Sequence, residues 1–161
     1  KEDVLLDFGC GSGNNTHRLA KICKSVTGVD HDSDKIRFAN ENFAAENVKF
    51  VCNDAVEFLK SSKQKYDVLV CANNLEHLDD PEGLIQDLKK YFSYAYIEVP
   101  DLDASYLNQA KTLLGIQLNY MDDDHVSEFV REDMYQLFAK QGLKIIESEY
   151  RFGAMKYWVE V

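Results

Sequence analysis

The chain has 161 residues, 45% of them hydrophobic and 29% charged, a composition typical of one globular domain with a sizeable core. Its apolar runs fall well short of the roughly 18 residues of a membrane span, so no membrane partner is expected. The formal net charge of −10 argues against a nucleic-acid partner, because nucleic-acid binders usually carry a basic face. The sequence leaves the oligomeric state open.

The cysteines give an expectation for the compartment. Cys10, Cys23, Cys52 and Cys71 include no C-x-x-C pair, and three of them lie in or beside apolar segments. This usage favours small buried residues in a reduced protein over disulfides or metal ligands, so a cytoplasmic location is expected. No signal peptide is visible, and the chain starts directly on a strand-like segment. We therefore expect the natural protein to carry further residues before Lys1.

The first hundred residues alternate short apolar runs with amphipathic segments, which predicts a βαβ fold with a mostly parallel sheet. A helix is expected after the first strand, with Thr16, Leu19 and Cys23 on one face. The other expected elements are strands over 4–8, 25–30, 48–55, 66–73 and 94–100, and helices over 33–47 and 81–93.

The last sixty residues are less regular at first and then resume the pattern. Residues 101–128 are interpreted as an insertion over the sheet within a single domain covering 1–161. A helix is predicted over 131–143 with Gly142 at its C-cap. Two final strands, 143–150 and 155–161, are predicted to form an antiparallel pair at a sheet edge.

The glycine-rich turn after the first strand carries the strongest functional signal. It reads Gly9-x-Gly11-x-Gly13, preceded by Asp7. A dinucleotide-binding turn needs G-x-G-x-x-G, and Asn14 stands where the third glycine would fall, so a nicotinamide-linked oxidoreductase is disfavoured. No Lys-Ser/Thr pair follows, so the turn is not a phosphate-binding P-loop either.

The stretch "LLDFGCGSG" resembles the first motif of class I S-adenosylmethionine-dependent methyltransferases, and three further motifs follow in order at predicted strand ends. The resemblance implies a Rossmann-like, doubly wound α/β sheet of seven strands in the order 3-2-1-4-5-7-6, with strand 7 antiparallel and helices on both faces. It also implies that Asp30 binds the ribose hydroxyls, that Asp54 accepts from the adenine amine, and that His31 packs against the adenine. The full set of implied cofactor-binding residues is Asp7, Gly9, Cys10, Gly11, Gly13, Asp30, His31, Asn53, Asp54, Ala55, Ala72 and Asn73.

Catalysis of methyl transfer to a hydroxyl or amine requires removal of a proton, and Glu76, His77 and His125 are the candidate catalytic residues. The Glu-His pair with a later histidine is similar to an E-x-x-E-H element that binds a divalent metal in small-RNA 3′-end and ubiquinone-pathway methyltransferases. Here Asn73 replaces the first acid of that element, so a metal ion is not favoured.

The resemblance implies transfer of a methyl group from S-adenosylmethionine to a small-molecule or glycan acceptor, with oxygen as the expected acceptor atom and S-adenosylhomocysteine as the product. A non-catalytic or degenerate cofactor-binding domain is the alternative. A metal-dependent RNA methyltransferase is disfavoured by the charge. Within the insertion, Tyr106, Leu107, Tyr120 and Met121 are candidates to roof a substrate pocket, against the simpler interpretation that they pack on the sheet.

Overall fold

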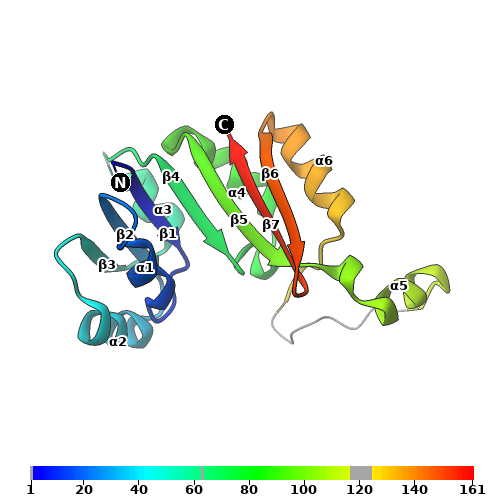
Figure 1. Cartoon of the computed structure of the whole chain (residues 1–161), viewed down its shortest axis with the longest axis horizontal. Helices are drawn as coiled ribbons and strands as arrows, with labels where there is room; N and C mark the ends of the chain where they lie inside the picture. Colours follow the sequence, from blue (N-terminus) through cyan, green and yellow to red (C-terminus); the bar gives the residue numbers. More distant parts are fainter. Residues whose placement is uncertain (1, 63, 117–124) are drawn as a thin grey trace.

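The computed structural model describes residues 2–62, 64–116 and 125–161. The strands in these ranges form one seven-stranded sheet (Figure 1). Its strand order confirms the order that the family resemblance implied. Listed from one edge to the other, the strands are β3 (Val48–Cys52), β2 (Ser25–Asp30), β1 (Val4–Phe8), β4 (Val68–Ala72), β5 (Tyr94–Pro100), β7 (Ala154–Glu160) and β6 (Lys144–Arg151). The strands from β3 to β5 pair in parallel, whereas β7 pairs antiparallel with both of its neighbours.

The helices predicted over 33–47, 81–93 and 131–143 begin at the predicted residues and end two to five residues earlier, whereas the helices over 55–61 and 106–113 were not predicted. The α-helices are α1 (Asn14–Leu19), α2 (Ser33–Phe43), α3 (Ala55–Ser61), α4 (Pro81–Leu88), α5 (Tyr106–Leu113) and α6 (Arg131–Gln141), with short 3-10 helices η1 (Leu75–His77), η2 (Lys89–Tyr91) and η3 (Leu102–Ala104). Aspartates cap three of the described α-helices at the N-terminus, where Asp32, Asp54 and Asp80 accept from backbone N–H groups of α2, α3 and α4. Gly142 ends α6 with φ +72°, as predicted.

Alternation along the strands divides the core into two layers. In β1, Leu6 and Phe8 point to the face covered by α3, α4 and α6, where the larger core cluster lies. Leu5 points to the opposite face and joins a smaller cluster with Val26 and Val68. Helices therefore lie on both faces, as predicted (Figure 1).

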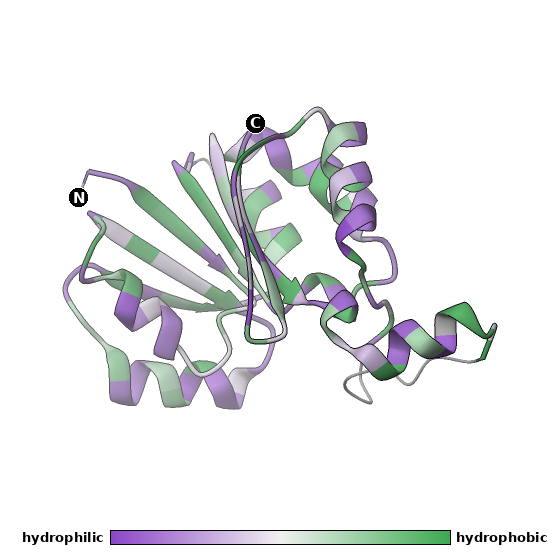
Figure 2. Ribbon diagram, turned by 45° about the vertical axis from the view of Figure 1, so that its right-hand side comes forward, coloured by the Kyte–Doolittle hydropathy of each residue, from purple (hydrophilic) through white to green (hydrophobic). Residues whose placement is uncertain are grey.

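The second face is covered only in part. Among the described residues, α1 and α2 lie over the β1–β3 side of it (Figure 1). Over β4, β5 and β7 an open groove of about 680 Å³ remains, lined in part by Val70, Tyr96 and Trp158. The central strands of the sheet consist largely of hydrophobic residues, as Figure 2 shows.

The insertion does not form the predicted roof in its described part. It contains η3 and α5, and α5 extends away from the sheet (Figures 1 and 2). Its apolar side chains are exposed, with Tyr106 at 86% and Leu107 at 64%, so neither lies over the sheet nor packs against it as expected. The other two candidates, Tyr120 and Met121, lie outside the described residues.

The final hairpin confirms the predicted antiparallel pair. Phe152 and Gly153 connect β6 to β7 with φ +56° and +76°. Two successive positive φ angles match the two-residue turns that suit the twist of a hairpin. None of the described helices has the length and apolar character that crossing a membrane would require.

Candidate functional site

A cleft of about 560 Å³ lies at the carboxyl ends of β1, β2 and β4, where ligands bind in open α/β sheets. It brings together predicted site residues from four separate parts of the sequence: Gly9, Gly11, Asp30, His31, Asp54, Ala55, Asn73 and His77. Sequence reasoning missed five further lining residues, which are Phe8, Val29, Lys35, Asn74 and Leu78. The cleft is therefore the candidate cofactor site.

The glycine turn presents Gly11 to the cleft. Gly9 and Gly11 have φ +67° and +53°, which L-residues rarely adopt. A Cβ on Gly9 would overlap the side chain of Asn74, whereas a Cβ on Gly11 would meet no described atom within 4 Å. Gly9 is thus required by packing inside the protein, and Gly11 keeps space open on the cleft side.

This difference predicts the behaviour of Gly11→Ala. The variant should lose at least tenfold in affinity for S-adenosylhomocysteine, because Gly11 lines the cleft and its turn must relax from an αL conformation that costs roughly 1–2 kcal/mol for alanine. Calorimetric titration measures the affinity. Gly153→Ala is the matched control, since Gly153 also has a positive φ and open space around its Cβ but lies in the β6–β7 turn. Equal affinity of the two variants would contradict the cofactor assignment of the turn.

Asp30 connects the glycine turn to the end of β2. Asp30 is 7% exposed. Its Oδ2 accepts from the Gly11 N–H at 2.8 Å, and its Oδ1 accepts from the Asp32 N–H at 2.9 Å. The backbone carbonyl of Asp30 also accepts from the Asn53 N–H at 3.0 Å. Each carboxylate oxygen can accept a second hydrogen bond, so the fixed carboxylate offers two acceptors to a ligand.

The rim of the cleft carries polar and aromatic side chains. His31 directly follows Asp30, and its side chain is 88% exposed. Asp54 is also exposed and caps α3, where Oδ1 accepts from the Glu57 N–H at 2.9 Å. Capping uses one carboxylate oxygen, so it is compatible with a contact from Oδ2 to a ligand. Lys35, in the first turn of α2, was not anticipated because lysines on helices are usually only solvated.

Several predicted cofactor residues are absent from the lining of the cleft. Asp7 is 3% exposed and accepts from the Thr16 hydroxyl at 2.6 Å, and its burial raises its pKa to about 6. Cys10 is also buried, and desolvation raises the pKa of its thiol to about 12. Gly13, Asn53 and Ala72 are likewise absent from the cleft lining. In the described residues these groups support the turn and the strand ends around the site.

Asn74 fixes the mouth of the cleft. Its side-chain amide donates to the carbonyl of Phe8 at 3.0 Å and to that of Ala72 at 2.8 Å, which ties the end of β1 to the end of β4. Its neighbour Asn73 has φ +52°, a conformation that asparagine accepts more readily than glutamate does. This backbone geometry gives a physical reason for asparagine at position 73. The tendency of asparagine side chains to bond nearby backbone was the available signal for Asn74.

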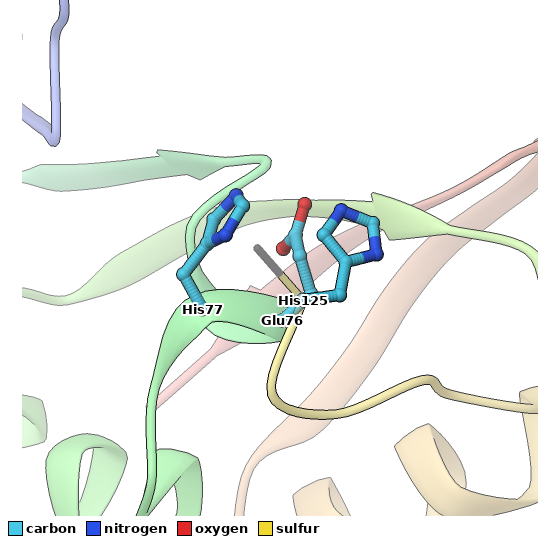
Figure 3. A group of neighbouring side chains, drawn as sticks. All are labelled: Glu76, His77 and His125. Carbon is cyan, nitrogen blue, oxygen red and sulfur yellow. The ribbon is translucent and has the colours of Figure 1, made fainter. Parts of the chain in front are cut away.

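The three candidate catalytic residues come together beside the cleft (Figure 3). Glu76 and His77 lie on η1, and the backbone carbonyl of Glu76 accepts from the N–H groups of Val126 and Ser127, which brings His125 to the same place. The imidazole rings of His77 and His125 lie edge to face, with 5.0 Å between their centres. One nitrogen or oxygen atom from each of the three side chains lies within 4.8 Å of the others.

Glu76 gives this cluster its electrostatic character. Glu76 is 1% exposed, and neither of its carboxylate oxygens has a hydrogen-bond partner among the described residues. Desolvation raises its pKa, although the neighbouring histidines oppose that shift. A buried carboxylate between two imidazoles is suited to holding a proton on the cluster or a cation within it. His77 reaches the cleft wall, so a proton or ion held here would be close to a bound ligand.

Three features indicate that the protein has a Rossmann-like methyltransferase fold. They are the strand order of the sheet, the glycine turn after β1 and the acidic residue at the end of β2. The family model described as "Methyltransferase domain" matches residues 1–148, and the chain therefore belongs to that family of class I S-adenosylmethionine-dependent methyltransferases.

Individual relatives agree with this assignment. The chain is 35% identical over 85 residues to a ubiquinone biosynthesis O-methyltransferase of Coxiella burnetii, covering 52% of the chain and 36% of the relative. The enzyme of the same name from Shewanella pealeana is 27% identical over 158 residues, covering 88% of the chain and 66% of the relative. The chain thus spans about a third of the first of these relatives and two thirds of the second.

Solved structures show the same fold at low identity. The plantazolicin methyltransferase BamL, solved with S-adenosylhomocysteine, matches with a TM-score of 0.75 and 16% identity, covering 99% of this chain and 77% of that one. Magnesium protoporphyrin IX methyltransferase from Synechocystis PCC 6803, also with S-adenosylhomocysteine, matches with a TM-score of 0.73 and 19% identity, covering 99% and 74%. The names of these two enzymes indicate different acceptors, so the shared fold does not identify the acceptor.

Proposed function

We propose that this chain binds S-adenosylmethionine in the cleft at the carboxyl ends of β1, β2 and β4 and transfers its methyl group to a hydroxyl of a small-molecule or glycan acceptor. The carrying observation is the Asp30 carboxylate, held by the Gly11 and Asp32 N–H groups at 2.8 and 2.9 Å beside the open space at Gly11. A rigid pair of carboxylate acceptors suits the vicinal hydroxyls of a ribose.

The rest of the cleft fits the remainder of that ligand. The exposed His31 ring offers a surface on which an adenine can stack, and Asp54 offers an acceptor for its amine. Gly11 allows the backbone to approach the ligand closely. These roles follow the family pattern residue by residue, and each residue lies on the wall of the same cleft.

The Glu76, His77 and His125 cluster supports an acceptor that must lose a proton. S-adenosylmethionine supplies a methyl group on a sulfonium sulfur, which leaves as a neutral thioether. Because a hydroxyl is a weak nucleophile until its proton is removed, a positioned imidazole raises the rate of such a transfer. The cluster provides two imidazoles beside the cleft, and His125 is the one we assign as the base. The O-methyltransferases among the relatives favour oxygen as the acceptor atom.

The proposal is tested first by calorimetry and then by turnover. We expect saturable binding of S-adenosylhomocysteine and no binding of NAD in a parallel titration. A panel of phenols, catechols, hydroxy acids and monosaccharides is then offered with S-adenosylmethionine, and formation of S-adenosylhomocysteine is measured. Binding without turnover of any acceptor would favour the non-catalytic alternative. Binding of NAD alone would contradict the cofactor assignment.

A further inference from the structure

Glu128 is a buried carboxylate beside the catalytic cluster that no sequence motif indicated. Its side chain is 3% exposed, and its Oε1 lies 2.8 Å from Nδ1 of His125, whose side chain is 7% exposed. A hydrogen bond between two buried ionisable groups is stronger than one at the surface, because little water competes for either partner. The pair is therefore a built feature of the site.

The backbone fixes both members of the pair. The segment that contains them is held to η1 by the N–H groups of Val126 and Ser127, which donate to the Glu76 carbonyl at 2.8 and 3.0 Å. At its other end, the Arg131 guanidinium donates to the Asp101 carboxylate at 2.7 Å. The first anchor lies between His125 and Glu128 and the second lies three residues beyond Glu128, so the backbone that carries both side chains is held in place.

This bond determines which nitrogen of His125 carries the proton. An ionised carboxylate accepts hydrogen bonds and donates none, so Nδ1 must be the protonated nitrogen when it is bonded to Glu128. In the neutral ring, the lone pair is then on Nε2. In Figure 3 one ring nitrogen of His125 faces Glu76 and the other points away from it. Because Nδ1 is engaged by Glu128, the nitrogen that faces Glu76 is Nε2.

We propose that Glu128 is a positioning residue that holds His125 in the Nδ1–H tautomer and so presents Nε2 as a proton acceptor. This inference rests on the proposed function. In the transfer, the acceptor's O–H proton moves to Nε2 while the oxygen forms a bond to the methyl carbon. The carbon–sulfur bond breaks, and its electron pair remains on sulfur. His125 becomes an imidazolium, and Glu128 stabilises that charge through the Nδ1–H bond.

The tautomer can be measured without any acceptor. In the chain carrying ¹⁵N-labelled histidine, long-range ¹H–¹⁵N correlation spectra distinguish a protonated Nδ1 from a protonated Nε2. We expect His125, identified by the signal missing from His125→Ala, to carry its proton on Nδ1. Glu128→Gln should lose this preference, because an amide can donate to Nδ1 as well as accept from it. Proton occupancy on Nε2 in the unsubstituted chain would overturn the proposal whatever the activity.

Turnover provides the second readout, measured with the acceptor of highest rate from the panel. Glu128→Gln should lower kcat by about 100-fold and leave the affinity for S-adenosylhomocysteine unchanged. The matched control is Glu132→Gln, the same substitution at an exposed glutamate in the first turn of α6, which should retain full turnover. If Glu128→Gln retained full turnover while His125→Ala lost turnover, the proposed role of Glu128 would be overturned and the role of His125 as the base would stand. Full turnover in His125→Ala would overturn the proposed base as well.

Discussion

Asp30→Ala should weaken binding of S-adenosylhomocysteine by about 100-fold or more, measured by calorimetric titration. The substitution removes both carboxylate oxygens offered to the ligand, and hydrogen bonds to a charged group contribute about 1.5–3 kcal/mol each. Two of them correspond to at least 10²-fold in the dissociation constant, at about 1.4 kcal/mol for each factor of ten. The Gly11 N–H also loses its acceptor at 2.8 Å, so the turn itself is less well held.

Asp32→Ala is the matched control for this prediction. Asp32 lies two residues after Asp30, just beyond the end of β2. Its carboxylate caps α2 by accepting from the N–H groups of Asp34 and Lys35. Loss of a cap costs about 1 kcal/mol of stability, which should appear as a lower thermal midpoint with cofactor affinity preserved. Equal affinity of Asp30→Ala and the unsubstituted chain would remove the basis for placing the cofactor in this cleft.

The fold could be predicted because its strands carry a simple pattern. Buried parallel strands appear as short continuous apolar runs, and the predicted ranges 4–8, 25–30 and 94–100 coincide with β1, β2 and β5. The helix starting at Arg131 was equally predictable, because its apolar positions repeat at helical spacing and a glycine follows. The strand order itself came from the family resemblance, since no local pattern specifies which strands are neighbours.

The insertion shows where this reasoning fails. Tyr106 and Leu107 are hydrophobic, and burying such side chains against the protein's own core is favourable. In the structure they lie on α5 and are exposed, so their hydrophobicity does not report burial. The pattern over 101–128 was too irregular to predict α5, and the surface against which a hydrophobic side chain packs is a tertiary property.

The candidate site also contains residues that the sequence could predict and residues that it could not. Asp7 and Asp30 both belong to strands that end at the cleft, but only Asp30 lines it, because Asp7 sits inside β1 and bonds Thr16 of α1. Asn73 was recognised by its motif position, whereas the neighbouring Asn74 makes the bonds that join two strand ends. Glu128 follows His125 by three residues in a segment without periodicity. Its role depends on a hydrogen bond that only the folded chain reveals.

His125→Ala should separate binding from chemistry. We expect its affinity for S-adenosylhomocysteine to stay within about twofold of the unsubstituted chain, because the His125 side chain is absent from the cleft lining. Its turnover should fall by about 10²–10⁴-fold, the usual contribution of a positioned general base. Steady-state kinetics at saturating S-adenosylmethionine, with the best acceptor from the panel, measures the loss as a change in kcat.

His17→Ala is the control for loss of an imidazole as such. His17 lies on α1 and packs against Phe43 with 5.3 Å between ring centres, on a different part of the molecule from the cluster at η1. It should lose some stability and no turnover. Cofactor binding lost in a folded His125→Ala variant would instead assign His125 to the cofactor site, and proton removal would then depend on His77, the histidine of the cluster that lines the cleft. Lost turnover with cofactor binding preserved would identify His125 as the base, which must reach the methyl acceptor. Lost cofactor binding would identify His125 as a residue that contacts S-adenosylmethionine, the methyl donor.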